Sequence, residues 1–168
     1  MSLLSPGQSF PHLTAGLADG QSLNLPGDVA GGFGVVLFYR GSWYPYCNAQ
    51  LRAFQRAQDE LTELGVRVVA LSIDDEATTA ATIDKHKLTY PVGRSADAAA
   101  IAKVTGAFVD PAGHFLQSTG FIIGPDGKVV LRTRAEITSF SGVGSATVLL
   151  WRSWWTRWRD GMRCCVRI

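Results

Sequence analysis

The sequence lacks a strong excess of charge of either sign. Sixteen lysines and arginines stand against fourteen aspartates and glutamates, and the formal net charge is +2 at pH 7. Proteins that bind nucleic acid usually carry a pronounced basic excess, so no nucleic-acid partner is expected. Hydrophobic residues make up 46% of the 168 residues and charged residues 18%, which is typical of a globular protein with its own core.

Long apolar runs and a basic leader are also missing. No uninterrupted stretch of about 18 apolar residues occurs, and the first residues lack a basic segment followed by an apolar one. Neither a membrane-spanning helix nor a secretory signal is therefore expected, and a reducing cytoplasm is the expected compartment. The few cysteines, Cys47 and the adjacent Cys164 and Cys165, do not form a disulfide framework. The three histidines lack the spacing of metal ligands, so no metal site is predicted.

The sequence does contain an alternation of strand and helix patterns. Residues 35–39 form a continuous apolar, β-branched and aromatic run, typical of a strand buried on both faces. Pro45 begins a helical pattern that Gly65 ends, and residues 66–73 indicate a second buried strand. The remaining patterns predict helices at 74–86 and 96–106, hairpins at 17–25 and 120–132, and an extended link at 88–95. This order predicts an α/β protein with a mixed central sheet and helices on both faces.

Cys47 falls in the first turn of the helix predicted from Pro45. The unpaired backbone N–H groups and the positive dipole end of a helix favour a negative sulfur there, and Arg40 can add a cation. Because a thiol reacts as its thiolate, we expect a lowered pKa and a nucleophilic Cys47. The alternative is that Cys47 is an inert, buried small hydrophobe.

The loop around Cys47 carries a family resemblance. "FYRGSWYPYC", from Phe38 to Cys47, resembles the active-site loop of the peroxiredoxin-like (AhpC/TSA) branch of the thioredoxin superfamily, where F-Y-R-G-x-W-C-P-Y-C joins a strand to a helix. The resemblance runs from Ser5 to Leu131 and includes "STGFIIGPDGKVV". It implies a thioredoxin-like domain over residues 1–135 and thiol-dependent reduction of peroxides or disulfides.

The resemblance also implies roles for single residues. Cys47 matches the peroxidatic cysteine of peroxiredoxins and the second cysteine of a thioredoxin C-x-x-C. Tyr44 replaces the first thioredoxin cysteine, which excludes exchange through a local dithiol, and its hydroxyl would replace that of the peroxiredoxin threonine. Arg40 stands where the peroxiredoxin motif has its proline, and Ser118 stands where a standard peroxiredoxin has an arginine. Cys47, Tyr44 and Arg40 are thus the expected catalytic residues.

Three further residues are candidate substrate contacts. Thr119 and Gly120 occupy the place where thioredoxin folds often have a cis-proline facing the active site. Trp43 lies inside the loop itself, where packing around the loop is its main expected role.

Two functions follow as hypotheses. In the first, the Cys47 thiolate reduces a hydroperoxide, becomes a sulfenic acid and is restored by an external thiol or a thioredoxin-like reductant, without metal or organic cofactor. In the second, the chain is a redox-inactive thioredoxin-fold interaction domain that has lost the dithiol motif. Self-association as a homodimer is an expectation from the family alone.

The segment 136–168 differs from the rest in composition. It holds most of the tryptophans and many arginines at helical spacing, which predicts an amphipathic helix docked on the sheet. An interfacial membrane helix and non-native sequence from a shifted reading frame are the alternatives. Cys164 and Cys165 are interpreted as incidental thiols, with a resolving role for one of them as the alternative.

Overall fold

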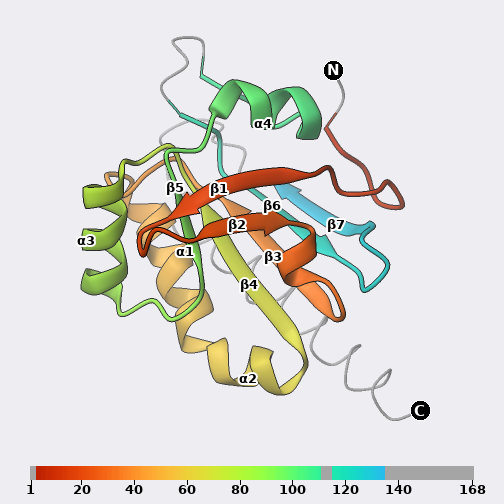
Figure 1. Cartoon of the computed structure of the whole chain (residues 1–168), viewed down its shortest axis with the longest axis horizontal. Coiled ribbons are helices and arrows are strands. Elements are labelled where there is room, and N and C mark those ends of the chain that lie inside the picture. The colour runs from red at the N-terminus through yellow and green to blue at the C-terminus, as the bar shows by residue number, and fades with distance from the viewer. Residues whose placement is uncertain (1–2, 111–114, 135–168) are drawn as a thin grey trace, which may run out of the picture. The chain divides into compact units, whose positions relative to one another are not determined.

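The computed structural model of the chain describes residues 3–110 and 115–134 (Figure 1). The chain divides into two units, residues 1–134 and residues 135–168. The bounds predicted for the thioredoxin-like domain, residues 1–135, stay a prediction. The Trp/Arg-rich segment predicted as residues 136–168, together with its helix, Cys164 and Cys165, lies outside the described residues.

One mixed sheet forms the centre of the described domain. Its strand order is β2-β1-β5-β4-β3-β6-β7. The strands are β1 (Leu13–Leu17), β2 (Ser22–Leu25), β3 (Phe33–Phe38), β4 (Val66–Leu71), β5 (Val92–Arg94), β6 (Thr119–Ile123) and β7 (Val129–Arg134). Parallel pairing joins β3, β4 and β5, and all other neighbours pair antiparallel. The predicted α/β class with a mixed sheet is confirmed.

Four α-helices and a short 3-10 helix accompany the sheet in the described residues. They are η1 (Gly27–Val29), α1 (Pro45–Arg56), α2 (Gln58–Glu63), α3 (Glu76–His86) and α4 (Ala98–Thr105). Asp75 and Asp97 cap α3 and α4 by accepting hydrogen bonds from the first-turn N–H groups of Thr78 and Ala100. Gly106 ends α4 in the left-handed conformation, as its place after the helical pattern predicts.

Two local predictions differ from the structure. The single helix expected up to Gly65 is divided at Ala57, whose φ of −94° and ψ of 1° interrupt the helical repeat. The link at 88–95 contains β5, which pairs with β1 on one side and β4 on the other. A strand of three residues is too short to show a periodic pattern, so only its neighbours in the sheet reveal it.

The sheet is covered on both faces. Alternate residues of a strand point to opposite faces. Val36 and Phe38 of β3 belong to a buried cluster that includes Ile101 of α4. Val35 and Leu37 are also buried and point to the other face of β3. In Figure 1, α1 lies to the left of β4, behind β5. The predicted two-sided burial of the central strand is therefore confirmed.

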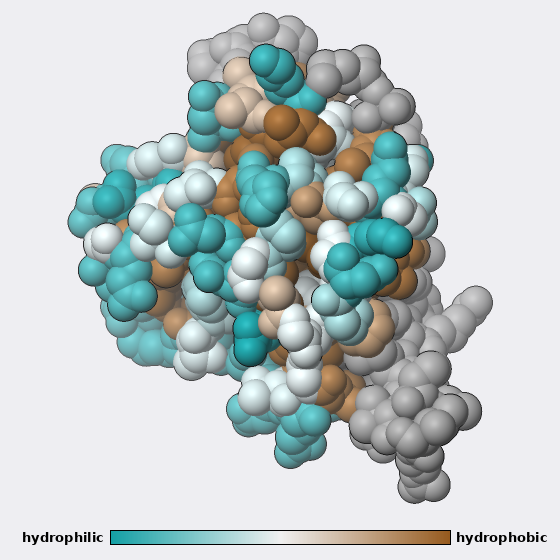
Figure 2. Space-filling view, turned by 45° about the vertical axis from the view of Figure 1, so that its right-hand side comes forward, coloured by the Kyte–Doolittle hydropathy of each residue, from teal (hydrophilic) through white to brown (hydrophobic). Residues whose placement is uncertain are grey.

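The surface of the domain is mixed in character. On the face seen in Figure 2, hydrophilic side chains interrupt the apolar areas. Within residues 3–110 and 115–134, no helix is long and apolar enough to cross a membrane. No cluster of three or more possible metal-binding side chains was found there either.

Candidate active site

The loop from β3 to α1 places Cys47 at the carboxyl end of the central parallel strands. Tyr39 extends β3 by donating its N–H to the carbonyl of Leu71 at the end of β4. Tyr44 is the extended residue before α1, and Pro45 takes the first helical position, where its missing N–H is not needed. Cys47 is then the third residue of α1, so its predicted place in the first turn is confirmed.

The sulfur of Cys47 is enclosed and partnered by polar groups. The residue is only 1% exposed. Its Sγ lies 3.2 Å from Oγ of Ser118, a residue 71 positions away in the sequence. The backbone N–H groups of Arg40 and Gly41 act as further donors that favour a negative charge on the sulfur. A thiolate here would therefore meet three donors, since the Ser118 hydroxyl can also donate.

Burial nevertheless dominates the acidity of this thiol. Loss of water around the sulfur raises the pKa of Cys47 above its ordinary value, while Ser118, the two N–H groups and the charge of Arg40 act in the opposite direction. The expected lowering of the Cys47 pKa is wrong. The partial positive charge of the helix N-terminus stabilises the thiolate, but the loss of solvent around the sulfur destabilises the thiolate by more.

Arg40 is held between two aromatic rings. Its guanidinium carbon lies 4.9 Å from the ring centroid of Tyr44 and 4.8 Å from that of Phe115, in the range of cation–π contacts. Its Nε is buried and makes no hydrogen bond among the described residues. These contacts hold the Arg40 cation within the loop between β3 and α1, where its positive charge favours the Cys47 thiolate.

An aromatic cluster surrounds Arg40 and the start of α1; its members are Trp43, Tyr44, Tyr46 and Phe115. Trp43 makes edge contacts with Tyr44 and Phe115 at centroid distances of 5.5 and 5.6 Å, and Tyr46 lies 5.3 Å from Tyr44. Trp43 and Tyr46 are 58% and 50% exposed, so the cluster presents aromatic surface to solvent. Burial raises the pKa of Tyr44, which keeps its hydroxyl protonated near neutral pH.

Thr119 and Gly120 lie in β6, between β3 and β7. Thr119 pairs with Phe38 and Gly120 pairs with Leu37 in the antiparallel register. The hydroxyl of Thr119 donates to the carbonyl of Gln117 at 3.0 Å. Substrate contact by Thr119, Gly120 or Trp43 stays a prediction.

Several residues near the sulfur were not singled out from sequence as site residues. The sequence marks Ser118 only by its place, where the family has an arginine, whereas the structure makes it a direct partner of the sulfur. Asp74 accepts a hydrogen bond from the N–H of Ser42 at 2.8 Å. Asp74 follows β4, and because β3 and β4 are parallel neighbours their carboxyl ends meet, a signal that could have found it.

Comparison with known proteins shows the family of the chain. The AhpC/TSA family model matches residues 6–132. A peroxiredoxin of Treponema denticola is 32% identical over 131 residues, covering 74% of this chain and 62% of the relative. A 1-Cys peroxiredoxin of Triticum aestivum is 29% identical over 140 residues, covering 76% and 63%. The chain thus matches about three fifths of the length of these curated relatives.

Solved structures show the same fold. The crystal structure of the peroxidoxin BcpB from Mycobacterium tuberculosis superposes with a TM-score of 0.72 at 20% identity, covering 87% of this chain and 94% of that one. The Enterococcus faecalis AhpC structure gives a TM-score of 0.69 at 19% identity, covering 94% and 95%. With the family match over residues 6–132, the chain belongs to the AhpC/TSA family and has its thioredoxin-like fold.

Proposed function

We propose that the protein is a thiol peroxidase that reduces hydroperoxides through Cys47 alone. The supporting observation is the 3.2 Å contact between the buried Cys47 sulfur and the Ser118 hydroxyl. The backbone N–H groups of Arg40 and Gly41 also favour the thiolate. Donors arranged in this way stabilise negative charge on the sulfur and on a peroxide oxygen that approaches it. Tyr44 occupies the place of the first dithiol cysteine, so the chemistry uses one thiol.

The reaction balances with one hydroperoxide and two external thiols. The Cys47 thiolate attacks one peroxide oxygen, the O–O bond breaks, and the leaving alkoxide or hydroxide takes up a proton. Cys47 becomes a sulfenic acid. A first external thiol forms a mixed disulfide and releases water, and a second thiol displaces Cys47 as its thiolate and leaves oxidised as a disulfide.

Arg40 and Tyr44 have distinct roles in this proposal. The Arg40 cation favours the thiolate and offsets charge on the leaving oxygen. The Tyr44 hydroxyl, protonated near neutral pH, is the proposed proton donor to that oxygen. A cytoplasmic location, a thioredoxin-like or small-thiol reductant and a homodimer belong to the same proposal and rest on the family alone.

Trapping the oxidised cysteine tests the proposal. Treatment with hydrogen peroxide in the presence of dimedone is expected to label Cys47, and Cys47→Ser is expected to abolish both the label and peroxide consumption. A Cys164→Ser/Cys165→Ser double variant is the control, because it leaves Cys47 as the single thiol. No adduct at Cys47, or unchanged peroxide loss in Cys47→Ser, contradicts the proposal.

The raised pKa of Cys47 favours a second candidate, the redox-inactive interaction domain. Burial keeps this thiol protonated, and a protonated thiol is a poor nucleophile. On that alternative the labelling experiment gives no adduct at any pH at which the protein stays folded. On the leading proposal the labelling rate rises with pH as the thiolate fraction increases.

A further inference from the structure

The peptide groups of Ser42 are held from both sides. Its N–H donates to Oδ2 of Asp74 at 2.8 Å, and its carbonyl accepts from Nδ2 of Asn48 at 2.7 Å. Asp74 belongs to the connection between β4 and α3, whereas Asn48 is the residue of α1 directly after Cys47. The loop between β3 and α1 is therefore hydrogen-bonded both to the connection after β4 and to α1.

His86, the last residue of α3, completes this arrangement. Its Nε2 lies 3.2 Å from Oδ1 of Asn48. The Ser42 carbonyl can only accept a hydrogen bond, so the amide nitrogen of Asn48 faces Ser42 and the amide oxygen faces His86. The Nε2 atom of His86 must then be the donor. We call Asp74, Ser42, Asn48 and His86 the Ser42 clamp.

The clamp does not depend on the charge of His86. Burial, Arg52 of α1 and Lys85 of α3 lower the pKa of His86, which favours the neutral imidazole near pH 7. The neutral Nε2–H tautomer and the imidazolium both donate from Nε2. The contact with Asn48 is therefore available in either protonation state, and its role is geometric.

The clamp also fixes the residue before Ser42. Gly41 has a φ of +153°, and a Cβ placed on it would lie 2.9 Å from Oδ1 of Asp74 and 2.6 Å from Nε1 of Trp43. Gly41 is thus packed tightly against Asp74, and its N–H is one of the backbone donors that favour the Cys47 thiolate. The clamp therefore contacts Gly41, which carries a backbone donor, and includes Asn48, the residue after Cys47.

We propose that Asn48 and His86 are positioning residues that hold the backbone donors of Arg40 and Gly41 on the sulfur of Cys47. This inference rests on the proposed peroxidase function. His86 acts through Asn48, and Asn48 acts through the Ser42 carbonyl. Without the His86 contact, the amide of Asn48 can rotate, the loop loosens, and the donors no longer converge on the thiolate. The sulfur also becomes more accessible.

Two reactions of Cys47 separate positioning from acidity. Iodoacetamide needs only an accessible thiolate, whereas peroxide reduction also needs the donors in place. Both require the thiolate, so the ratio of the peroxide rate constant to the alkylation rate constant is independent of the thiolate fraction. In the Cys164→Ser/Cys165→Ser background, His86→Leu is expected to raise alkylation and to lower this ratio about tenfold.

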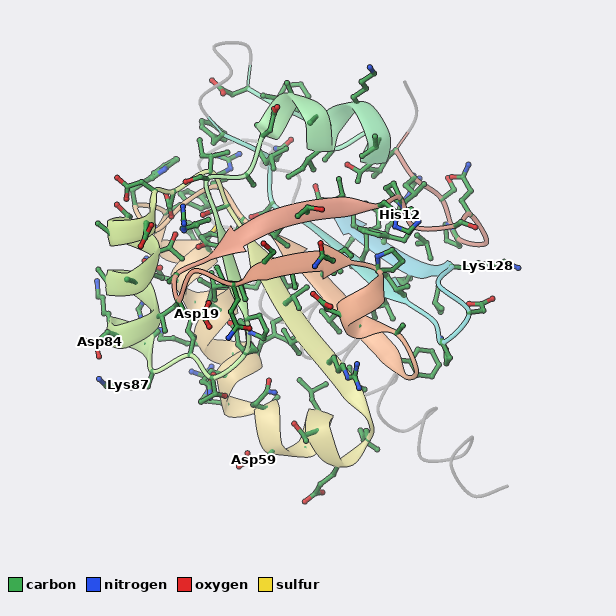
Figure 3. All side chains as sticks on the ribbon, viewed as in Figure 1. His12, Asp19, Asp59, Asp84, Lys87 and Lys128 are labelled. Carbon is green, nitrogen blue, oxygen red and sulfur yellow. The ribbon has the colours of Figure 1, made fainter. Side chains whose placement is uncertain are left out.

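Matched variants test the chain of contacts. His86→Gln keeps an N–H donor and is expected to restore the ratio to within about threefold of the parent protein. His12→Leu removes an exposed imidazole that Figure 3 shows well away from the end of α3 marked by Asp84 and Lys87, and it should leave the ratio unchanged. Val129→Ala destabilises the core away from the clamp and should also leave the ratio unchanged.

Each outcome decides the proposal. An unchanged ratio in folded His86→Leu, or no recovery in His86→Gln, overturns it. If His86→Leu does not fold, Asn48→Asp is measured in its place. This variant loses the side-chain donor to the Ser42 carbonyl and is expected to lower the ratio as well. An unchanged ratio in Asn48→Asp overturns the proposal. If the parent protein does not react with peroxide, the peroxidase proposal fails. The pH dependence of alkylation then decides alone: a raised Cys47 pKa or a faster limiting rate in His86→Leu supports the clamp, and an unchanged pH profile overturns it.

Discussion

At Cys47, two opposing effects act on one atom. Enclosure of the sulfur raises its pKa, and the hydroxyl of Ser118 with the N–H groups of Arg40 and Gly41 counteracts that rise. Ser118 is the first of these opposing effects in size. This balance means that small changes in the hydrogen bonds of the sulfur alter the thiolate fraction without any change in the fold.

Ser118→Ala is therefore expected to raise the pKa of Cys47 further. The substitution removes a donor to the thiolate and leaves the burial of the sulfur in place. The pH dependence of alkylation by iodoacetamide measures the change, and labelling at neutral pH should be slower. Ser118→Thr keeps the hydroxyl and serves as the control. An unchanged or lowered pKa in Ser118→Ala would contradict the assigned contact.

At the scale of elements, the junction of β3 and α1 carries the chemistry. The strand ends at Phe38, the loop turns through Gly41, and α1 begins at Pro45. Asp74, in the connection after β4, meets this loop because β3 and β4 are parallel neighbours. The site thus depends on the close approach of two connections, and at Gly41 this approach leaves no room for a Cβ beside Asp74.

Gly41→Ala is expected to destabilise the protein by about 1–3 kcal/mol and to slow the reaction of Cys47 with peroxide. A Cβ at this position collides with Trp43 and Asp74, and φ of +153° is unfavourable for alanine. Denaturant unfolding and dimedone labelling measure the two effects. Gly27→Ala, where a Cβ meets no atom within 4 Å, is the matched control and should change neither. Equal free energies of unfolding for Gly41→Ala and Gly27→Ala would contradict the prediction, because they would show that the loop rearranges to accept the Cβ.

At the scale of the whole molecule, the raised pKa of Cys47 links folding to pH. In the unfolded chain the thiol regains its ordinary pKa of about 8.5, so the unfolded state loses its proton first as the pH rises. The contribution of Cys47 to the free energy of unfolding is therefore fully present below about pH 8.5 and is lost as the pH rises towards the folded-state pKa.

Replacing the thiol should remove this dependence. The free energy of unfolding of the wild-type protein is expected to fall between pH 7 and about pH 9.5, and that of Cys47→Ala to fall less over the same range. Urea unfolding at several pH values provides the comparison. Burial raises the pKa of Tyr39 to about 12 and also raises that of Tyr90, so these phenols act mainly at higher pH. Parallel pH profiles for the two proteins would contradict the raised thiol pKa.

Local patterns were sufficient for the order of elements and for the start of α1. Apolar periodicity, Pro45 and the glycine stops act over a few residues, so the sequence alone predicted the strands other than β5, most helix positions and the place of Cys47 in a first turn. The same patterns indicated a mixed sheet. They could not predict the interruption at Ala57 or the short β5, which depend on neighbours in space.

Only the tertiary structure decided the state of the sulfur. The contact between Cys47 and Ser118 joins residues 71 positions apart, and that between Asn48 and His86 joins residues 38 apart. The 1% exposure of Cys47 likewise results from packing of the whole domain. A helix start can be predicted from its own residues, whereas desolvation and distant partners arise only when the elements pack, and here that packing reversed the expected direction of the pKa.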